Sequence, residues 1–76
     1  PGPDLEEKAV SRSDLDNIKQ ALANLKEDYQ TVIIWHYLDD LSIPEMAKVL
    51  KRPAGTVRVM LHRALKALKN ELNQNV

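Results

Sequence analysis

Residues 41–72 constrain the fold of this chain more than any other segment. Ser42 and Glu45 have the spacing of a capping box, in which each side chain accepts a hydrogen bond from the backbone amide of the other residue. Pro44 falls in the first turn of the helix that follows, where its missing N–H costs nothing. Pro53 ends that helix, because its ring disfavours helical geometry in the residue before it. We therefore expect a helix at residues 43–50, a turn near residues 50–53 and another helix at residues 54–72.

The helix expected at residues 54–72 has an apolar face and a basic face. Apolar residues recur at helical spacing and should pack on the earlier helices: Val57, Leu61, Ala64, Leu65, Leu68 and Leu72. Most of the remaining large side chains lie on the opposite stripe: Arg58, Val59, His62, Arg63 and Lys66. A short helix, a tight turn and a second helix with an outward basic stripe are typical of a helix-turn-helix that presents its second helix to DNA.

The start of the same helix is suited to phosphate contact. Gly55 allows close approach of a backbone or phosphate at a modest cost in helix propensity. The Thr56 hydroxyl can contact a phosphate or cap the helix locally. The amides of the first turn add positive dipole character, which favours the same ligand.

The charge of the chain is polarised, although its formal net charge is zero. Residues 1–45 contain four basic and ten acidic side chains, whereas residues 46–76 contain seven basic and one acidic side chain. Binding of a polyanion responds to local potential, so a basic half can bind nucleic acid within a neutral chain. The alternative is that these charges only solvate exposed helix faces.

Two further helices are expected at residues 14–25 and 27–38. The first has apolar residues at intervals of three and four, namely Leu15, Ile18, Leu22 and Leu25, and Ser13 with Asp16 as a capping pair. The second opens with two acidic residues and then carries a dense apolar run: Tyr29, Val32, Ile33, Ile34, Trp35 and Tyr37. Its β-branched residues 31–34 would also suit a strand, but no second strand exists to pair with it. The sequence therefore predicts an all-α, compact four-helix domain.

Length and composition predict one domain with a small core. A chain of 76 residues without cysteine has neither disulfides nor thiolate metal ligands, so packed helices must supply its stability. It has no apolar run of about 18 residues and no signal-peptide pattern, which predicts no membrane span and a cytoplasmic location. We interpret residues 1–12, which begin Pro1-Gly2-Pro3, as an expression scar and flexible leader, residues 13–73 as the domain and residues 74–76 as a frayed tail.

The sequence contains no recognisable catalytic or metal-binding set. His36 and His62 lie far apart, and no cysteine or nearby second histidine completes a metal site with either of them. Asp39 and Asp40 are expected to end the second helix, because a catalytic carboxylate pair needs partners and a pocket. Without a nucleophile and base, a phosphate loop or a cofactor motif, the sequence predicts a protein that is not an enzyme and has no cofactor.

Two motifs are more specific than the helical pattern. They are Leu41-Ser42 with Glu45-Met46-Ala47, and Pro53-Ala54-Gly55-Thr56-Val57-Arg58. The first resembles the Leu-Ser-x-x-Glu-Ile-Ala motif, and the second the Gly-Thr-Val-basic motif, of region 4 in bacterial sigma factors of the sigma-70 family, especially the extracytoplasmic-function (ECF) group. Further matches are Arg63-Ala64 and the Leu25-x-Glu27-Asp28-Tyr29 approach to the second helix. The resemblance covers residues 15–72.

The resemblance implies a winged-helix-like DNA-binding domain. Such a domain recognises the −35 promoter element in double-stranded DNA, docks on the β flap of RNA polymerase and directs transcription initiation. The residues facing bases would be Arg58, Val59, His62 and Arg63. The residues holding phosphates would be Lys48, Lys51, Arg52, Thr56 and Lys66. The planar fork of arginine matches the O6/N7 pair of guanine, whereas valine offers only an apolar contact to a thymine methyl.

The chain departs from the family pattern at six positions. In the turns, it has Lys51 where many relatives have glycine, Pro53 where they have a capping serine or threonine, and Lys26 where many have proline. Three residues stand where relatives commonly carry basic side chains: Gln30, His36 and Met60. We expect the isolated domain to bind DNA weakly and to depend on polymerase or a partner domain for occupancy.

Two alternative functions remain open on the sequence. The domain could serve mainly as a protein-interaction module that binds the β flap or an anti-sigma factor through apolar helix surfaces. It could instead be the effector domain of a response regulator, which shares the helix-turn-helix and the Thr-Val start of the second helix. Arg63-Ala64 and the acidic approach helix favour the sigma-type domain, which we expect to be a monomer in isolation.

Overall fold

The structure, a computed structural model, describes residues 12–74. These residues form four helices and no strand: α2 (Arg12–Ala23), α3 (Glu27–Tyr37), α4 (Ile43–Leu50) and α5 (Ala54–Gln74). The predicted all-α class is confirmed, and so is the helical assignment of the β-branched residues 31–34. Arg12 and Gln74, which were expected in the leader and the tail, belong to helices. The rest of the predicted leader and tail, residues 1–11 and 75–76, lies outside the described residues.

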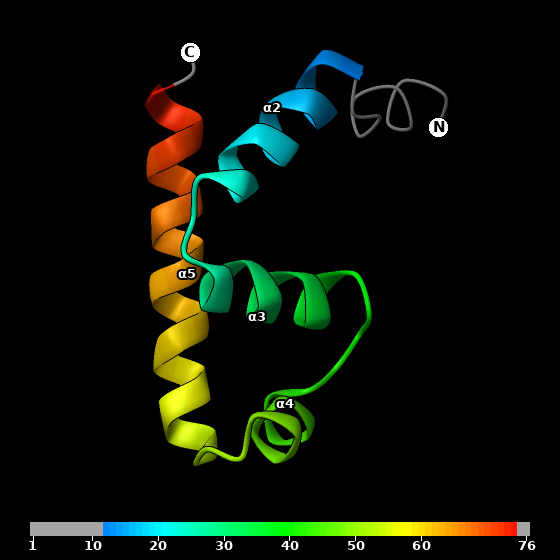
Figure 1. Cartoon of the computed structure of the whole chain (residues 1–76), viewed down its shortest axis with the longest axis vertical. Coiled ribbons are helices and arrows are strands. Elements are labelled where there is room, and N and C mark those ends of the chain that lie inside the picture. Colours follow the sequence, from blue (N-terminus) through cyan, green and yellow to red (C-terminus); the bar gives the residue numbers. More distant parts are fainter. Residues whose placement is uncertain (1–11, 75–76) are drawn as a thin grey trace, which may run out of the picture.

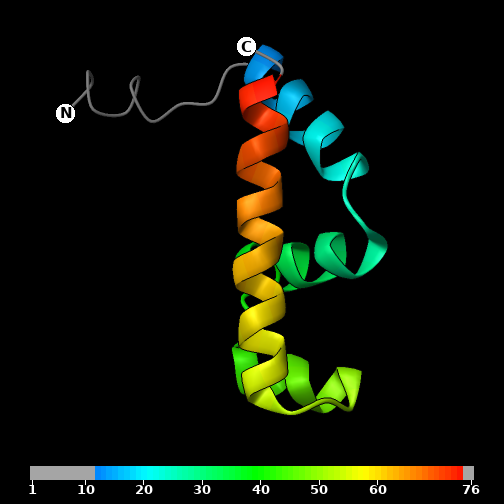
Figure 2. The same cartoon turned by 90° about the vertical axis from the view of Figure 1, so that its left-hand side faces the viewer.

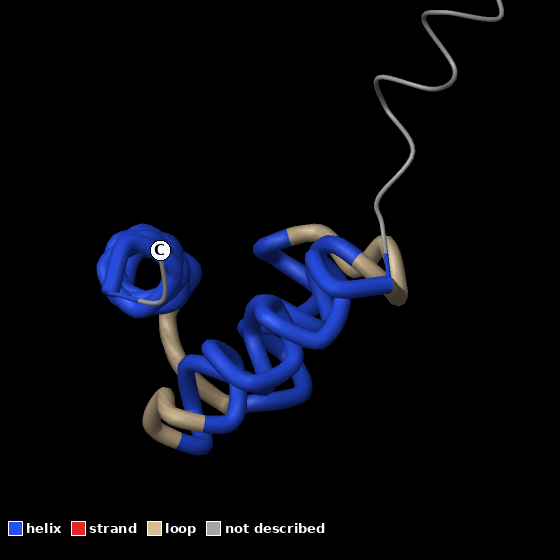
Figure 3. Tube along the Cα trace, turned by 90° about the horizontal axis from the view of Figure 1, so that it is seen from above, coloured by secondary structure: helices blue, strands red, loops and turns tan. Residues whose placement is uncertain are grey.

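The other three helices are arranged along α5. In Figure 1 α5 runs the length of the molecule, with α2 beside its C-terminal end, α4 beside its N-terminal end and α3 between them. Figure 2 shows the same order from the side. The view along α5 in Figure 3 places α2, α3 and α4 together on one side of it. α5 contacts each of the other helices and α3 most extensively, so its opposite side is left uncovered by the described part of the chain.

The core lies where α3, α4 and α5 meet. Its largest fully buried side chains, one from each helix, are Val32, Met46 and Val57. The other members of this core are Ile33, Ala47, Leu61 and Ala64. The buried residues of α5 all belong to the apolar face predicted from the sequence, which confirms that face.

α2 is less completely packed than its sequence pattern predicts. Ala21 is its one buried residue, and Leu15 is 46% exposed. The predicted capping by Ser13 is wrong, because the helix begins at Arg12 and Ser13 lies within its first turn. α2 lies near the C-terminal end of α5, where fewer helices surround it, so its apolar stripe is only partly covered.

The loop between α3 and α4 is closed by two contacts to Leu41. Its amide donates a hydrogen bond to the Trp35 carbonyl at 2.9 Å. His36 Nδ1 lies 2.8 Å from the Leu41 carbonyl oxygen, and because that oxygen can only accept, the ring nitrogen is the donor. Asp40 has a φ of 59°, a left-handed conformation that aspartate tolerates better than most residues. The half-buried His36 therefore ties the helix-turn-helix to α3.

α4 begins with the capping box predicted from Ser42 and Glu45. The Glu45 amide donates to Ser42 Oγ at 3.2 Å, and the Ser42 amide donates to Glu45 Oε1 at 2.8 Å. The hydrogen bond from the Ser42 backbone, and then the contact with its side chain, hold the pKa of Glu45 below its ordinary value of 4.5. The box determines where α4 starts and thereby where the following turn lies.

We predict that Ser42→Ala lowers the free energy of unfolding by about 1 kcal/mol at pH 7, because it leaves the Glu45 amide without its cap. For a domain of this size the melting temperature should fall by about 4–8 °C in a circular dichroism melt. Ionised Glu45 stabilises the folded state above its ordinary pKa of 4.5, and this contribution disappears as the pH falls through the lowered folded pKa. The variant keeps the backbone amide of residue 42 and loses only the part of this contribution that comes from the Ser42 side chain, so the difference between wild type and variant should become only slightly smaller in acid.

Ser13→Ala is the matched control. Ser13 is exposed in the first turn of α2, and its replacement by the better helix former should not destabilise the protein. An equal loss in both variants, or no loss in Ser42→Ala, would contradict the role given to the capping box.

Candidate nucleic-acid interface

The outward stripe of α5 is fully available to a ligand. Its members are exposed: Arg58, Val59, His62, Arg63 and Lys66. They alternate along the helix with buried residues of the apolar face, which hold α5 in a fixed rotation about its axis. Val59 is 48% exposed although it is apolar, and three of its neighbours on the stripe are arginine or histidine. The four residues predicted to face bases thus lie together on one uncovered helix face.

The last turn of α4 and the turn before α5 carry three of the predicted phosphate-binding residues. Lys48, Lys51 and Arg52 are all exposed there. The Lys51 amide donates to the Lys48 carbonyl at 3.3 Å and the Arg52 amide to the Ala47 carbonyl at 3.1 Å, the two bonds of a Schellman motif. Three cations therefore lie along the last turn of α4 and the turn that leads to α5.

Lys51 adopts a backbone conformation that suits glycine. Its φ of 59° and ψ of 46° lie in the left-handed region, where a β-carbon costs about 1–2 kcal/mol. Lys51 is also one of the positions at which the chain departs from the family pattern. A lysine here lowers the stability of the turn and adds a positive charge next to the start of α5.

The start of α5 has free space around its backbone. The amides of Thr56 and Val57 donate to the Pro53 carbonyl at 3.0 and 3.1 Å, which fixes the first turn. A β-carbon placed on Gly55 would meet nothing within 4 Å, so the fold itself does not require glycine there. The absence of a side chain leaves the backbone open to a ligand, as expected from the sequence.

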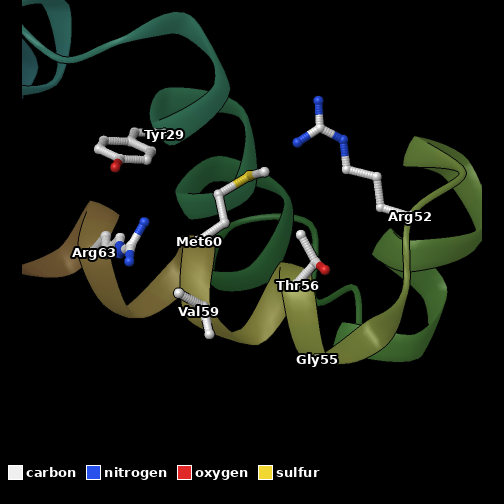
Figure 4. A pocket seen from close by; sticks show the side chains of 7 residues that line it. All are labelled: Tyr29, Arg52, Gly55, Thr56, Val59, Met60 and Arg63. Atoms are coloured by element: carbon white, nitrogen blue, oxygen red, sulfur yellow. The ribbon is translucent and has the colours of Figure 1, made fainter.

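A hollow of about 440 Å³ lies between the start of α3 and the first half of α5. We refer to it as the α3–α5 hollow, and Figure 4 shows the residues that line it: Tyr29, Arg52, Gly55, Thr56, Val59, Met60 and Arg63. Met60 lies near its centre, with Arg52 to one side and Tyr29 to the other. The hollow brings predicted base-facing and phosphate-binding residues to the two ends of one surface.

A second concave surface has entirely different chemistry. This apolar groove, of about 270 Å³, is formed by α2, the end of α3 and the second half of α5: Ile18, Leu22, Ile33, Ile34, Tyr37, Leu38, Leu65 and Leu68. It exposes no polar surface. Leu38 and Tyr37 at its rim are 72% and 54% exposed. Exposed apolar side chains gathered along a groove are typical of a protein-docking surface.

The described residues offer neither a metal site nor a membrane span. Residues 12–74 contain no group of three or more histidine, cysteine or acidic side chains placed to hold a metal ion. Within the same range, none of the helices is both long and apolar enough to cross a bilayer. His36 binds the Leu41 carbonyl and His62 lies exposed on the α5 stripe, so the two histidines serve different surfaces.

Two residues of the hollow were not assigned to the interface from the sequence. Tyr29 was placed in the apolar run of α3, and Met60 was noted only as a departure from the family. Tyr29 lies far from α5 in the sequence, and only the packing of α3 on α5 brings the two together. The sequence offered one signal for such a role: Tyr29 stands at the start of an apolar helix, and tyrosine combines an apolar ring that can pack with a polar end that can reach a ligand.

Comparison with known proteins places these features in one family. Residues 15–68 match the model of sigma-70, region 4. The chain is 41% identical over 69 residues to the ECF RNA polymerase sigma factor SigW of Bacillus subtilis, covering 90% of this chain and 37% of that protein. It is 33% identical over 70 residues to the ECF RNA polymerase sigma-E factor of Haemophilus influenzae, covering 91% and 37%.

A further relative, the RNA polymerase sigma factor SigV of Bacillus subtilis, is 33% identical over 58 residues, covering 76% of this chain and 35% of that protein. The chain thus spans little more than a third of the length of these curated relatives. No solved structure gives a match.

We predict that Lys51→Gly makes the domain more stable and lowers its affinity for DNA. Glycine removes the left-handed strain but loses more backbone freedom on folding, so the free energy of unfolding should rise by only about 0.5–1 kcal/mol. Loss of one phosphate contact should weaken binding on every duplex and reduce the slope of log K against log salt by about 0.9. Chemical denaturation and fluorescence anisotropy at several salt concentrations measure the two effects.

Lys51→Ala provides the control, since it removes the same charge but keeps the β-carbon. It should lose DNA affinity to the same extent without the gain in stability. If the glycine variant is no more stable than the alanine variant, the strain assigned to Lys51 is absent; if both bind DNA as wild type does, the lysine makes no phosphate contact.

Proposed function

The chain belongs to the sigma-70 region 4 family, and on this basis we propose that it recognises the −35 element of a promoter and directs RNA polymerase to it. The observation that carries the proposal is the exposed stripe of α5 beside the cationic turn. A helix with this stripe fits the major groove, where base edges can be read, while the turn meets the DNA backbone. Membership of this family also decides against the response-regulator alternative.

The base-reading residues in this proposal are Arg58, Val59, His62 and Arg63. Arginine discriminates guanine by two parallel hydrogen bonds, and an exposed valine can contact a thymine methyl. Lys48, Lys51, Arg52, Thr56 and Lys66 are assigned to phosphates, which position the domain without reading sequence. All nine residues except Thr56 and Val59 carry or can carry a positive charge, so binding should depend strongly on salt.

We further propose that the apolar groove is the surface that docks on RNA polymerase, at the β flap. Its support is the uncovered apolar lining from three helices, with Leu38 72% exposed at the rim. The groove uses the second half of α5 and the hollow uses the first half, so polymerase and DNA can bind at the same time. An anti-sigma factor that covered this groove would compete with polymerase.

We predict that Arg58→Ala or Arg63→Ala costs about 1–3 kcal/mol on the preferred duplex and relaxes the base preference at one position. The preferred duplex is first selected from a randomised library with the wild-type chain. Lys66→Ala should weaken binding similarly on preferred and random duplexes, because a phosphate contact carries no sequence information.

Lys19→Ala, an exposed lysine on α2, controls for the general loss of one charge and should bind as wild type does. Equal losses on preferred and random duplexes for both arginine variants would remove the base-reading assignment. A wild-type chain that selects no sequence, even as part of the polymerase holoenzyme, would favour an interaction module with little DNA recognition.

We predict that Leu38→Lys weakens binding to RNA polymerase core enzyme by about ten-fold, because it places a charge at the rim of the apolar groove. DNA binding by the chain alone should not change. Leu15→Lys is the control, since Leu15 is also exposed and apolar but does not line the groove. Equal affinities of both variants for the core enzyme and for an isolated β-flap fragment would place the docking surface elsewhere.

A further inference from the structure

The α3–α5 hollow combines an apolar floor with polar ends. Val59 and the half-buried Met60 supply the floor. On the side of the turn lie the Arg52 guanidinium and the Thr56 hydroxyl, as Figure 4 shows. On the opposite side the Tyr29 hydroxyl is directed toward Arg63. The polar groups that could contact a ligand are thus separated by an apolar surface.

Two cations lie near Tyr29, and one of them, Arg63, lines the hollow. Lys26 Nζ lies 5.7 Å from the centroid of the Tyr29 ring, close enough for a cation–π contact. Arg63 lines the same end of the hollow. The acidic residues Glu27 and Asp28 are neighbours of Tyr29 in the sequence, but neither lines the hollow. An anionic group can therefore approach the Tyr29 hydroxyl from the side of α5.

Along the hollow a polar end is followed by an apolar floor and a second polar end. This order matches the order of groups along the backbone of a DNA strand. A strand presents a charged phosphate, then a deoxyribose with apolar C–H groups, then the next phosphate. Phosphates are bound by arginine, hydroxyl groups and tyrosine in protein–DNA complexes. A single free anion would occupy one end of the hollow only and would leave Met60 without a partner.

We propose that the α3–α5 hollow seats one sugar–phosphate segment of a DNA strand. Met60 lies under the sugar, Arg52 and Thr56 bind one phosphate, and the Tyr29 hydroxyl donates to the next phosphate of the same strand. Tyr29 thereby becomes a DNA contact from α3, outside the helix-turn-helix. The inference rests on the proposed function, since it requires α5 to lie against DNA.

The test is a double-mutant cycle between protein and DNA. The 76-residue chain, as wild type, Tyr29→Phe or Arg52→Gln, is titrated at low salt with its preferred duplex. In a set of duplexes, each phosphate in turn is replaced by a neutral methylphosphonate. Tyr29→Phe keeps the ring and its packing, and removes only the hydroxyl, so the fold should be unaffected. Tyr37→Phe, on the other tyrosine of α3, which does not line the hollow, is the matched control.

On the unmodified duplex we expect Tyr29→Phe to bind about five-fold more weakly and Tyr37→Phe to bind as wild type does. The loss from Tyr29→Phe should vanish when one particular phosphate is neutralised. The loss from Arg52→Gln should shrink at the adjacent phosphate of the same strand, with a salt slope lower by about 0.9. Coupling to two adjacent phosphates of one strand supports the proposal.

Three outcomes would overturn it. These are unchanged binding by Tyr29→Phe, coupling of the two residues to phosphates on opposite strands, and an equal loss in Tyr37→Phe. If one of these outcomes is found and the base preference of the chain still depends on Arg58, the inference fails but the proposed function stands. A wild-type chain that prefers no sequence, alone or within the polymerase holoenzyme, removes the proposed function and this inference together.

Discussion

The burial of one face of α5 is the constraint on which the rest of the structure depends. α5 contacts each of the other three helices, and Val57, Leu61 and Ala64 are its buried residues. A helix has one rotation about its axis that buries such a stripe, and that rotation exposes the residues on the other side. Burial of the apolar face therefore orients Arg58 and Arg63 toward solvent, and no interaction of the arginine side chains is needed for this. Function on this face depends on apolar packing on the opposite one.

The turn between α4 and α5 combines a strained backbone conformation with a positive charge. Its Schellman hydrogen bonds and the following Pro53 give it a defined geometry, yet Lys51 occupies a left-handed conformation that glycine would adopt at lower cost. The strain is local and small compared with the total stability of a domain. In return a cation stands between α4 and the start of α5, where the DNA backbone would pass. In the proposed function, one residue thus affects stability and DNA binding in opposite directions.

The two concave surfaces differ in chemistry, and we propose that they bind two kinds of partner. The α3–α5 hollow has arginines at both ends and fits a polyanion, whereas the apolar groove exposes no polar surface and fits a protein. α2 lies near the C-terminal end of α5, and its apolar stripe is only partly covered by other helices. The apolar groove is therefore open to a partner. In a chain with zero net charge, the separation of the two chemistries allows DNA and protein to be bound by different parts of one small core.

The sequence alone determined the elements whose signals are local. Ser42, Glu45 and Pro53 act through their own backbone neighbours, so the start and end of α4 and both faces of α5 were predicted correctly. One local signal was misleading, because Ser13 lies inside α2 and does not cap it. Otherwise the sequence failed where the outcome depends on which helices meet, as at Leu15, which is exposed although it was expected to pack. The hollow between Tyr29 and Arg52 and the apolar groove belong to this second class. Each is made by residues from at least two helices, and only tertiary packing sets the distance between them.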